Sequence, residues 1–247
     1  MVAVVRCDVC GKFAHFRRFY TNSSSLSYPI PPPSTIRGLV AAALGLERDE
    51  YSERLRTLRV AIGVRQPLRM VLQSVNALMV DSGAERQLRG FEDRTQIPTQ
   101  FLLPETRLDD WDTAALRFHL ILVPPDGLPV DQLAAALQAP IYPPALGTAY
   151  CLGWIENVEI RQATIGQEDL SVADYLGALD ASQIEEFILD ERIPHRLSRD
   201  RYPVRLDKQR RLVEARDLIA DLRGYPIRCR YRGPWLEIES ERWALID

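Results

Sequence analysis

The sequence lacks any uninterrupted apolar run near the ~18 residues that a membrane-spanning helix requires. Its first residues also lack a basic segment ahead of an apolar one, so we expect no secretory signal and a cytoplasmic location. Lysine and histidine are scarce, because the chain holds only Lys12, Lys208, His15, His119 and His195. Nearly all of the positive charge is arginine, whose high pKa makes it a poor proton donor or acceptor in catalysis.

Cysteine is also rare, and its spacing argues against a metal site. Cys7 and Cys10 form a C-x-x-C pair, but no second pair follows and the histidines are scattered. A lone C-x-x-C is weak evidence for zinc, since a structural site needs four ligands at defined spacing. The preceding run, 2–5, is typical of a buried strand. We interpret the cysteines as structural thiols of a reducing compartment and predict no metal and no cofactor.

The formal net charge of −3 gives by itself no hint of a nucleic-acid partner, but the charges are unevenly distributed. Residues 156–191 contain ten acidic residues and one basic residue, whereas residues 192–216 contain nine basic and three acidic residues. Residues 1–40 contain five basic residues and one acidic residue. Two basic patches in an acidic chain permit a local anionic ligand without a generally basic surface.

Hydrophobic periodicity predicts an α+β fold whose first part alternates strands and helices. The predicted strands cover 2–10, 58–64, 115–123 and 150–160. The predicted helices cover 34–45, with a continuation over 50–58, and 130–137. The resulting order, β-α-β-β-α-β, is that of the ferredoxin-like fold, which the RNA-recognition motif also uses.

A C-terminal extension over 164–247 is expected to follow a core over 1–163. Its sequence predicts helix-like stretches near 172–176 and 184–189, and a helix over 212–222. Residues 227–231 and 235–239 are predicted to form a closing hairpin across Arg232-Gly233-Pro234.

About 50 residues, 65–113, separate the second and third predicted strands. Connections in compact domains seldom exceed about 12–15 residues, so this segment is predicted to be a functional insertion. Apolar stretches at 70–72 and 77–80, followed by a polar run with glycines, favour an arm or hairpin.

The segment 27–46 combines a proline-rich rod with a helix start. Ser34 or Thr35 is expected as the N-cap of an apolar, strongly helical run. Arg37 places a cation in the first turn, where the helix dipole favours an anion, and Gly38 costs about 1 kcal/mol relative to alanine in a helix. A phosphate docked at the helix start would explain both residues. The alternative, equally supported by the residues, is that Gly38 allows close helix packing and Arg37 lies in solvent.

Two stretches carry a family resemblance. Residues 11–17 (GKFAHFR) and 27–45 (SYPIPPPSTIRGLVAAALG) resemble the N-terminal signature of the fifth CRISPR-associated (Cas-five) protein family, the RAMP-type subunits of type I Cascade surveillance complexes. The element at 146–153 (LGTAYCLG) resembles the glycine-bearing hairpin before that family's last core strand. The resemblance is tight over 1–46, moderate to residue 160 and vague beyond.

This resemblance implies a ferredoxin-like (RAMP) core, a thumb hairpin inserted after the second strand, and binding of the 5′ handle of CRISPR RNA (crRNA). It also implies contacts with the backbone subunit and the large subunit of Cascade, an indirect relation to target DNA, and a subtype similar to type I-B. A bent single-stranded handle needs helix-end amides, arginines and stacking rings. The predicted RNA-binding residues are Arg17, Arg18, Tyr28, Ser34, Thr35, Arg37, Gly38, Arg65, Arg69, Arg94, Gly147 and Tyr150.

Some of these residues also have a structural interpretation. For Tyr28, packing of the ring on the neighbouring prolines is favoured over base stacking. Arg17 and Arg18 could simply end a solvated strand, although their basic neighbourhood favours RNA for at least one of them. Arg65, Arg69 and Arg94 belong to the insertion, from which they could reach phosphates where the handle gives way to the spacer.

An enzymatic alternative comes from one branch of the resembled family, which is a metal-independent endoribonuclease that processes CRISPR precursor RNA with a tyrosine, a lysine and a histidine. Here His119 is predicted in mid-strand with neither lysine nearby, and His15 has only Lys12 close in sequence. We therefore predict a non-catalytic subunit. A pure protein scaffold would leave Arg37 and Gly38 unexplained.

Overall fold

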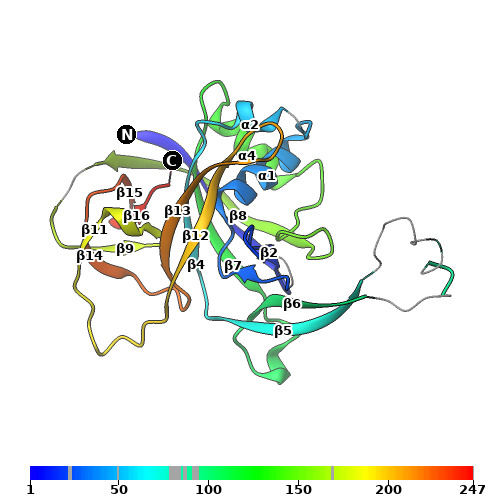
Figure 1. Cartoon of the computed structure of the whole chain (residues 1–247). Helices are drawn as coiled ribbons and strands as arrows, with labels where there is room; N and C mark the ends of the chain where they lie inside the picture. Colours follow the sequence, from blue (N-terminus) through cyan, green and yellow to red (C-terminus); the bar gives the residue numbers. More distant parts are fainter. Residues whose placement is uncertain are drawn as a thin grey trace.

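The computed structural model describes residues 1–21, 24–48, 50–77, 85, 88–90, 95–167 and 170–246. Within these residues the molecule is rich in strands and contains few helices (Figure 1). None of the helices among them is long and apolar enough to cross a membrane.

Four antiparallel strands from the first two-thirds of the chain form one half of a nine-stranded sheet. They are β1 (Val2–Gly11), β4 (Arg59–Val64), β7 (Leu116–Val123) and β8 (Gly153–Gly166). Their order across the sheet is β8-β1-β7-β4. β1 is central and buried on both faces, which explains why its sequence is almost continuously apolar. The strands predicted in this part of the chain are therefore confirmed.

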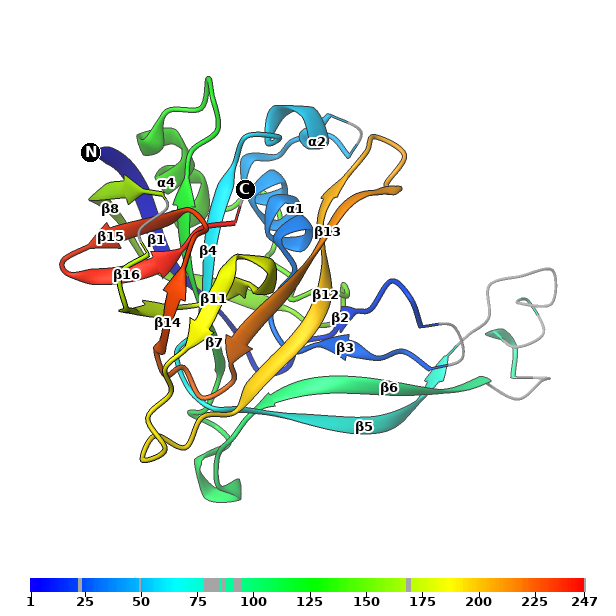
Figure 2. The same cartoon turned by 60° about the vertical axis from the view of Figure 1, so that its left-hand side comes forward.

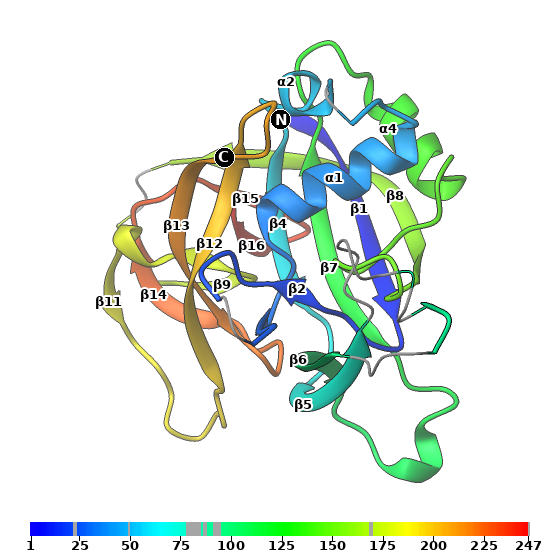
Figure 3. The same ribbon diagram turned by 45° about the vertical axis from the view of Figure 1, so that its right-hand side comes forward.

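Helices α1 (Pro33–Leu44) and α4 (Val130–Gln138) cover one face of these four strands, as Figure 3 shows, and the short helix α2 (Tyr51–Arg54) lies beside them. Ile36 and Val40 of α1 and Leu133 of α4 are buried with the strand side chains in one core. Both long helices occur where they were predicted. The predicted continuation over 50–58 is limited to the single turn of α2.

The start of α1 corrects one prediction. Pro32, not Ser34 or Thr35, is the N-cap residue, and no side chain caps the helix. The Pro32 carbonyl accepts hydrogen bonds from the backbone N–H groups of Thr35 and Ile36, at 2.9 and 3.1 Å. Pro33 fits the first helical position because an N–H at that position has no intrahelical partner. Ser34 and Thr35 therefore lie within the first turn.

The predicted insertion contains a long hairpin that projects from the body of the molecule (Figures 1 and 2). Its strands are β5 (Leu68–Ala77) and β6 (Thr95–Pro104), paired from Leu68–Pro104 at the base to Ala77–Thr95. At the base, Leu102 exchanges two backbone hydrogen bonds with Ala14 and is fully buried. The arm is thus anchored in the core at its base. A turn of 3₁₀ helix, η1 (Leu108–Asp110), follows it, and β2 (Phe16–Arg17) pairs with β3 (Ser27–Tyr28) nearby.

The three helical stretches predicted for the C-terminal region are wrong. Residues 172–176 contain β9 (Ala173–Leu176), residues 184–189 contain β11 (Ile184–Phe187), and residues 212–222 contain β13 (Leu212–Asp221). β13 pairs along its length with β12 (Leu197–Leu206) and also with the short β10 (Leu179–Asp180). Alternate residues near the C-terminal end of β13 are buried in the main core. They are Leu218 and Ala220, followed by Leu222 just beyond the strand.

The predicted closing hairpin is also wrong, although both of its strands exist. β14 (Ile227–Tyr231) pairs with β9 and β11, whereas β15 (Trp235–Ile238) pairs with β8 and with β16 (Glu241–Ala244). Glu239 and Ser240 both have positive φ, at 50° and 72°, which is the backbone of a tight two-residue hairpin turn. That turn makes β15 and β16 the hairpin.

The two parts of the chain share one sheet, in the order β11-β14-β9-β16-β15-β8-β1-β7-β4. β8 joins them, because its C-terminal end pairs with β15. The predicted boundary between residues 163 and 164 falls inside β8, and the division into core and extension stays a prediction.

Candidate nucleic-acid interface

The structure brings four of the predicted residues together at one groove. Ser34, Thr35 and Gly38 of α1 lie on one side, and Gly147 comes from the loop before β8. The groove has a volume of about 360 Å³, and Arg210 from the β12–β13 connection also lines it. The Thr35 and Ile36 N–H groups already donate to the Pro32 carbonyl, so the helix contributes mainly its positive dipole end, and the arginine adds a fixed positive charge. The groove therefore has the polarity that suits an anionic ligand.

Gly38 is an open position on the wall of this groove. A Cβ atom placed there would meet no heavy atom within 4 Å, apart from its own helix backbone and chain neighbours. Packing within the described chain therefore does not require glycine, although glycine destabilises a helix interior by roughly 0.5–1 kcal/mol. The bare backbone at Gly38 leaves room for another molecule to approach the helix closely.

Gly147 differs from Gly38, because the fold itself requires a glycine there. Its φ is +95°, and a Cβ atom would collide with the carbonyl oxygen of His15. Gly147 forms a bridge with His15, next to the hydrogen bond from the His15 N–H to the Leu146 carbonyl at 3.0 Å. Backbone pairing with the segment around His15 therefore holds this side of the groove in place.

Arg37 does not face the groove. Its side chain is buried, with 4% of the residue exposed. The guanidinium donates to the carbonyl oxygens of Val204, at 2.6 Å, and Leu58, at 2.9 Å. It thereby connects α1 to β12 and to the chain before β4. The geometry gives Arg37 a structural role in place of both sequence-based alternatives, the phosphate contact and the solvated side chain.

Tyr28 is likewise part of the core. Its side chain is fully buried, and its ring stacks on that of Tyr202 at a centroid distance of 4.6 Å. Its hydroxyl donates to the Arg201 carbonyl at 2.8 Å. Packing was the favoured interpretation for this ring, but the structure places it against β12 rather than against the prolines alone.

The two arginines at positions 17 and 18 have different surroundings. Arg18 forms an ion pair with Asp200 at 2.8 Å and donates to the Ser27 carbonyl at 3.1 Å. Arg17 is exposed, and it forms no ion pair with the described residues. Arg17 is therefore the more accessible of the two for a ligand.

Three of the remaining predicted residues, Arg65, Arg69 and Tyr150, lie around the base of the β5–β6 hairpin. Arg65 is half-exposed and lies 3.5 Å from the Asp8 carboxylate, while Arg69 on β5 is exposed. Tyr150 is 55% exposed, with its ring near that of Phe101 on β6. Arg94 and the apolar residues at 78–80 lie outside the described residues.

The histidines are held by partners inside the fold. Nδ1 of His119 lies 2.6 Å from Oδ1 of Asp8, and Asn157 donates to the other oxygen of Asp8 at 2.9 Å. Burial alone would raise the pKa of Asp8, but the hydrogen bonds from His119 and Asn157 outweigh it and lower that pKa to about 2. Burial lowers the pKa of His119.

His15 has equally complete partners. Its ring nitrogens lie 2.7 Å from the Gln100 carbonyl and 2.8 Å from the Ser25 hydroxyl, and burial lowers its pKa. Lys12 donates to three backbone carbonyls, those of residues 111, 112 and 114. These side chains are therefore used within the fold and present no exposed general acid or base.

The two cysteines of the C-x-x-C pair are free thiols with little tendency to ionise. Burial raises the pKa of Cys7 well above its usual value and that of Cys10 to about 11. In the part of the chain that the structure describes, no group of three or more His, Cys, Asp or Glu side chains is placed to hold a metal ion.

Sequence reasoning missed Arg210 as a neighbour of α1. It has a positive φ of 60° at the turn between β12 and β13, and this hairpin brings it to the groove from far along the chain. The basic run at 192–216 was the signal that could have found it, but the segment was not connected to α1 because its neighbour β13 was predicted to be a helix.

Comparison with solved structures shows a shared fold. The chain is similar to a crystal structure of a CRISPR protein from Archaeoglobus fulgidus, with a TM-score of 0.55, 15% identity and 98% of each chain covered. It is also similar to a crystal structure of a Cas protein (TM-score 0.48, 21% identity, 90% of this chain and 95% of that one). A further similar chain belongs to a CRISPR RNA-guided surveillance complex (TM-score 0.48, 15% identity, 90% and 91% covered).

Sequence comparison is more specific about the family. No curated protein matches the chain. The sequence model of the family described as CRISPR-associated protein (Cas_Cas5), however, matches residues 4–219. Because that match spans most of the chain, including both walls of the groove, the protein belongs to the CRISPR-associated Cas5 family.

Proposed function

We propose that the protein is a non-catalytic subunit of a type I CRISPR surveillance (Cascade) complex and binds the 5′ handle of crRNA in the groove beside α1. The observation that carries this proposal is the open Gly38 position, close to the helix N-terminus in a groove that Arg210 also lines. The bare helix backbone and the N-terminal dipole suit a phosphate, and Arg210 can pair with it bidentately. Membership of the Cas5 family supports the CRISPR context.

The arrangement of the core supports the same proposal. The order β8-β1-β7-β4, with α1 and α4 on one face, fits a ferredoxin-like (RAMP) core. In this interpretation the β5–β6 hairpin is the thumb that grips RNA at the end of the handle, using Arg65 and Arg69. Tyr150 at its base and Arg17 on β2 add a ring and a cation for the RNA.

We also propose that the hairpin contacts the backbone subunit of Cascade, and that another surface contacts the large subunit, so that the protein relates to target DNA only indirectly. Met70 and Leu72 on β5 are 39% and 60% exposed, which leaves apolar surface for a neighbouring subunit to cover. A type I-B-like complex remains the proposed subtype.

The endoribonuclease alternative requires a base, an acid and a cation around the scissile phosphate. His15 and His119 are 1% and 2% exposed, and Lys12 is bound to backbone carbonyls. This geometry favours the non-catalytic proposal. Site-specific cleavage of CRISPR precursor RNA by the purified protein, lost in His15→Ala or His119→Ala, would establish the alternative instead.

Binding of a fluorescent handle oligonucleotide to the full-length chain, followed by anisotropy, tests the proposal. Arg210→Ala should weaken binding by about tenfold, because a charge-assisted hydrogen bond contributes about 1.5–3 kcal/mol. Lys208→Ala removes a cation from the same connection without altering the lining of the groove and serves as the matched control. Equal losses in both variants, or no preference for the handle over a scrambled oligonucleotide, would contradict the proposal.

A further inference from the structure

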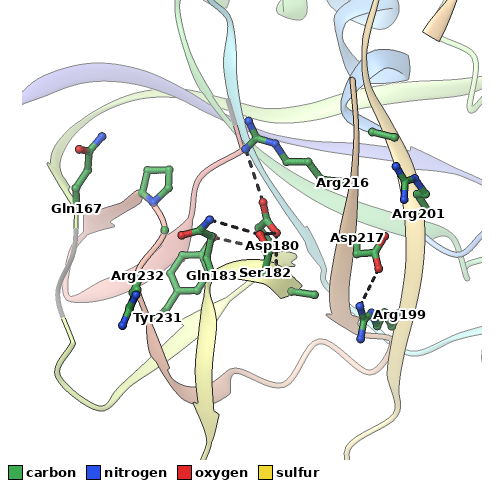
Figure 4. Close-up of a pocket in the computed structure, with 14 residues that line it drawn as sticks. Gln167, Asp180, Ser182, Gln183, Arg199, Arg201, Arg216, Asp217, Tyr231 and Arg232 are labelled. Atoms are coloured by element: carbon green, nitrogen blue, oxygen red, sulfur yellow. Dashed lines mark hydrogen bonds and ion pairs between the residues drawn. The ribbon is translucent and has the colours of Figure 1, made fainter. Parts of the chain in front are cut away.

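A second, larger cleft of about 670 Å³ lies in the C-terminal region and shares no lining residue with the groove beside α1. One side is formed by η2 (Ala181–Gln183) with Asp180, and by the β14–β15 turn. The other side is formed by the paired strands β12 and β13, and Figure 4 shows the labelled side chains of both sides. Neither sequence motifs nor the proposed RNA site account for it.

Arginines dominate the charge of this cleft. Arg199, Arg201, Arg216 and Arg232 line it, against the carboxylates of Asp180 and Asp217. Three of the arginines already have carboxylate partners. Arg199 pairs with Asp217 at 2.8 Å, Arg216 pairs with Glu214 at 2.7 Å, and Arg232 pairs with Glu185.

Arg201 is the exception. Its residue is exposed on β12, and its guanidinium forms no ion pair with any residue that the structure describes. Only its backbone is engaged locally, since the N–H donates to Asp200 at 2.8 Å and the carbonyl accepts from Tyr28. A guanidinium with available donors beside three neutralised neighbours is suited to one carboxylate or one phosphate.

The rest of the lining favours a peptide over a nucleic acid. Single-stranded nucleic acids are held by several cations along the backbone and by exposed rings that stack on bases. Here the one lining aromatic residue, Tyr231, is fully buried and offers no face for base stacking, and only one lining arginine, Arg201, has a guanidinium without an ion-pair partner among the described residues. The amides of Gln167 and Gln183 can instead pair with the N–H and C=O groups of a peptide backbone.

We propose that this cleft binds an acidic peptide segment of a partner protein, with an Asp or Glu carboxylate of that segment on the Arg201 guanidinium. The non-polar part of the lining, contributed by Ala181, Ala215, Gly233 and Pro234, packs against the segment between its carboxylates. The inference stands independently of the proposed RNA site, because it uses different residues and a different class of ligand.

The test is an NMR titration of the full-length chain that follows the arginine Nε–Hε resonances. The probe is the blocked peptide acetyl-Gly-Asp-Glu-Asp-Gly-amide, and its control is the amide isostere acetyl-Gly-Asn-Gln-Asn-Gly-amide. We expect saturable shifts with the acidic peptide at least about tenfold tighter than with the amide peptide. Arg201→Ala should weaken acidic-peptide binding about tenfold or more, as expected for loss of a charge-assisted bond.

Arg228→Ala is the matched control, because Arg228 is an exposed arginine that pairs with Asp174 outside the cleft. It should leave peptide binding unchanged. Gln183→Glu is a second, nearly isosteric variant that adds a negative charge to the lining, and it should also weaken the acidic peptide. Thermal melting of each variant checks that the fold is retained.

Three outcomes would overturn the proposal. Equal affinity for the two peptides, or no saturable shift with the acidic one, would remove the carboxylate site. Unchanged acidic-peptide binding in both Arg201→Ala and Gln183→Glu would place that binding elsewhere. Tighter binding of a single-stranded oligouridylate that depends on Arg201 would make the cleft a phosphate site.

Discussion

The two sides of α1 present a contrast within a single turn of helix. On the closed side, Arg37 and Ile36 are buried against β12 and the sheet, and the Arg37 guanidinium is bound to two backbone carbonyls. On the open side, Ser34, Thr35 and Gly38 line a groove, and a Cβ at Gly38 would meet no heavy atom within 4 Å outside its own helix backbone and chain neighbours. Adjacent residues of one sequence signature thus have different surroundings, and if the open side binds the ligand as proposed, substitutions on the two sides should separate stability from binding.

The largest expected effect is on the closed side. Arg37→Ala leaves the Val204 and Leu58 carbonyls buried without their donor, and the free energy of unfolding should fall by about 3 kcal/mol. Urea denaturation measures this loss. Arg48→Ala, which removes an exposed arginine beyond the end of the same helix, is the control and should change stability by less than about 0.5 kcal/mol. An Arg37→Ala variant as stable as the wild type would contradict the structural role of Arg37 on the closed side of the helix.

The fixed wall of the groove comes next. Gly147→Ala forces a Cβ onto the His15 carbonyl at a backbone conformation that alanine rarely adopts. We expect a loss of about 1–3 kcal/mol in unfolding free energy, from strain alone. Gly127→Ala is a sharp control, because Gly127 also has positive φ but has open space around its Cβ position, so any difference between the variants reports the collision.

Acidification should separate folding from ligand binding without any substitution. The pKa values of His15 and His119 are lowered in the folded state, so the unfolded chain binds protons more readily below its ordinary histidine pKa of 6.5. The contribution of these two histidines to the free energy of unfolding is therefore fully present above about pH 6.5, and it declines as the pH falls below that value. The groove contains no histidine or carboxylate, so the RNA affinity of the folded protein should stay constant over the same range. Thermal melting and anisotropy measured in parallel check both statements.

The smallest effect is expected for Gly38→Ala, which should raise stability and weaken handle binding. Gly38→Ala adds a methyl group into open space, so the helix should gain roughly 0.5–1 kcal/mol in stability. The same methyl group occupies the wall of the groove and should weaken handle binding. A variant that is more stable and binds the handle equally well would remove Gly38 from the site while leaving the structural contrast intact.

The sequence predicted β1, α1, β4, β7 and α4 because each has a clear apolar pattern, and all but β4 also have proline or glycine at an end. It could not predict which side of α1 is buried. Residues 39–44 are apolar all around the helix, so their pattern does not distinguish the face that packs on β12 from the face that lines the groove. The role of Arg37 depends on the Val204 carbonyl, which lies far along the chain.

The errors in the C-terminal region have a similar cause. Residues 212–222 (LVEARDLIADL) have acceptable helix propensity, but pairing with β12 and burial of Leu218, Ala220 and Leu222 override it. The turn at Glu239-Ser240 lacks the Asn-Gly or Asp-Gly pair that usually marks a two-residue hairpin, so its partner strands were misassigned. The sequence predicted the groove residues of α1 and Gly147. It did not predict Arg210, which reaches the groove only through the β12–β13 hairpin.

The position of β16 in the sheet has a consequence for how the protein is made. This last strand lies between β9, to which it runs parallel, and β15, while Ile246 just beyond it bridges to Val60 of β4. During synthesis on the ribosome, β9 and β14 emerge earlier and cannot join the rest of the sheet until β16 fills the gap. The four strands β8, β1, β7 and β4 can pair first, and β16, which follows all the other strands of the sheet in the chain, then connects the two halves.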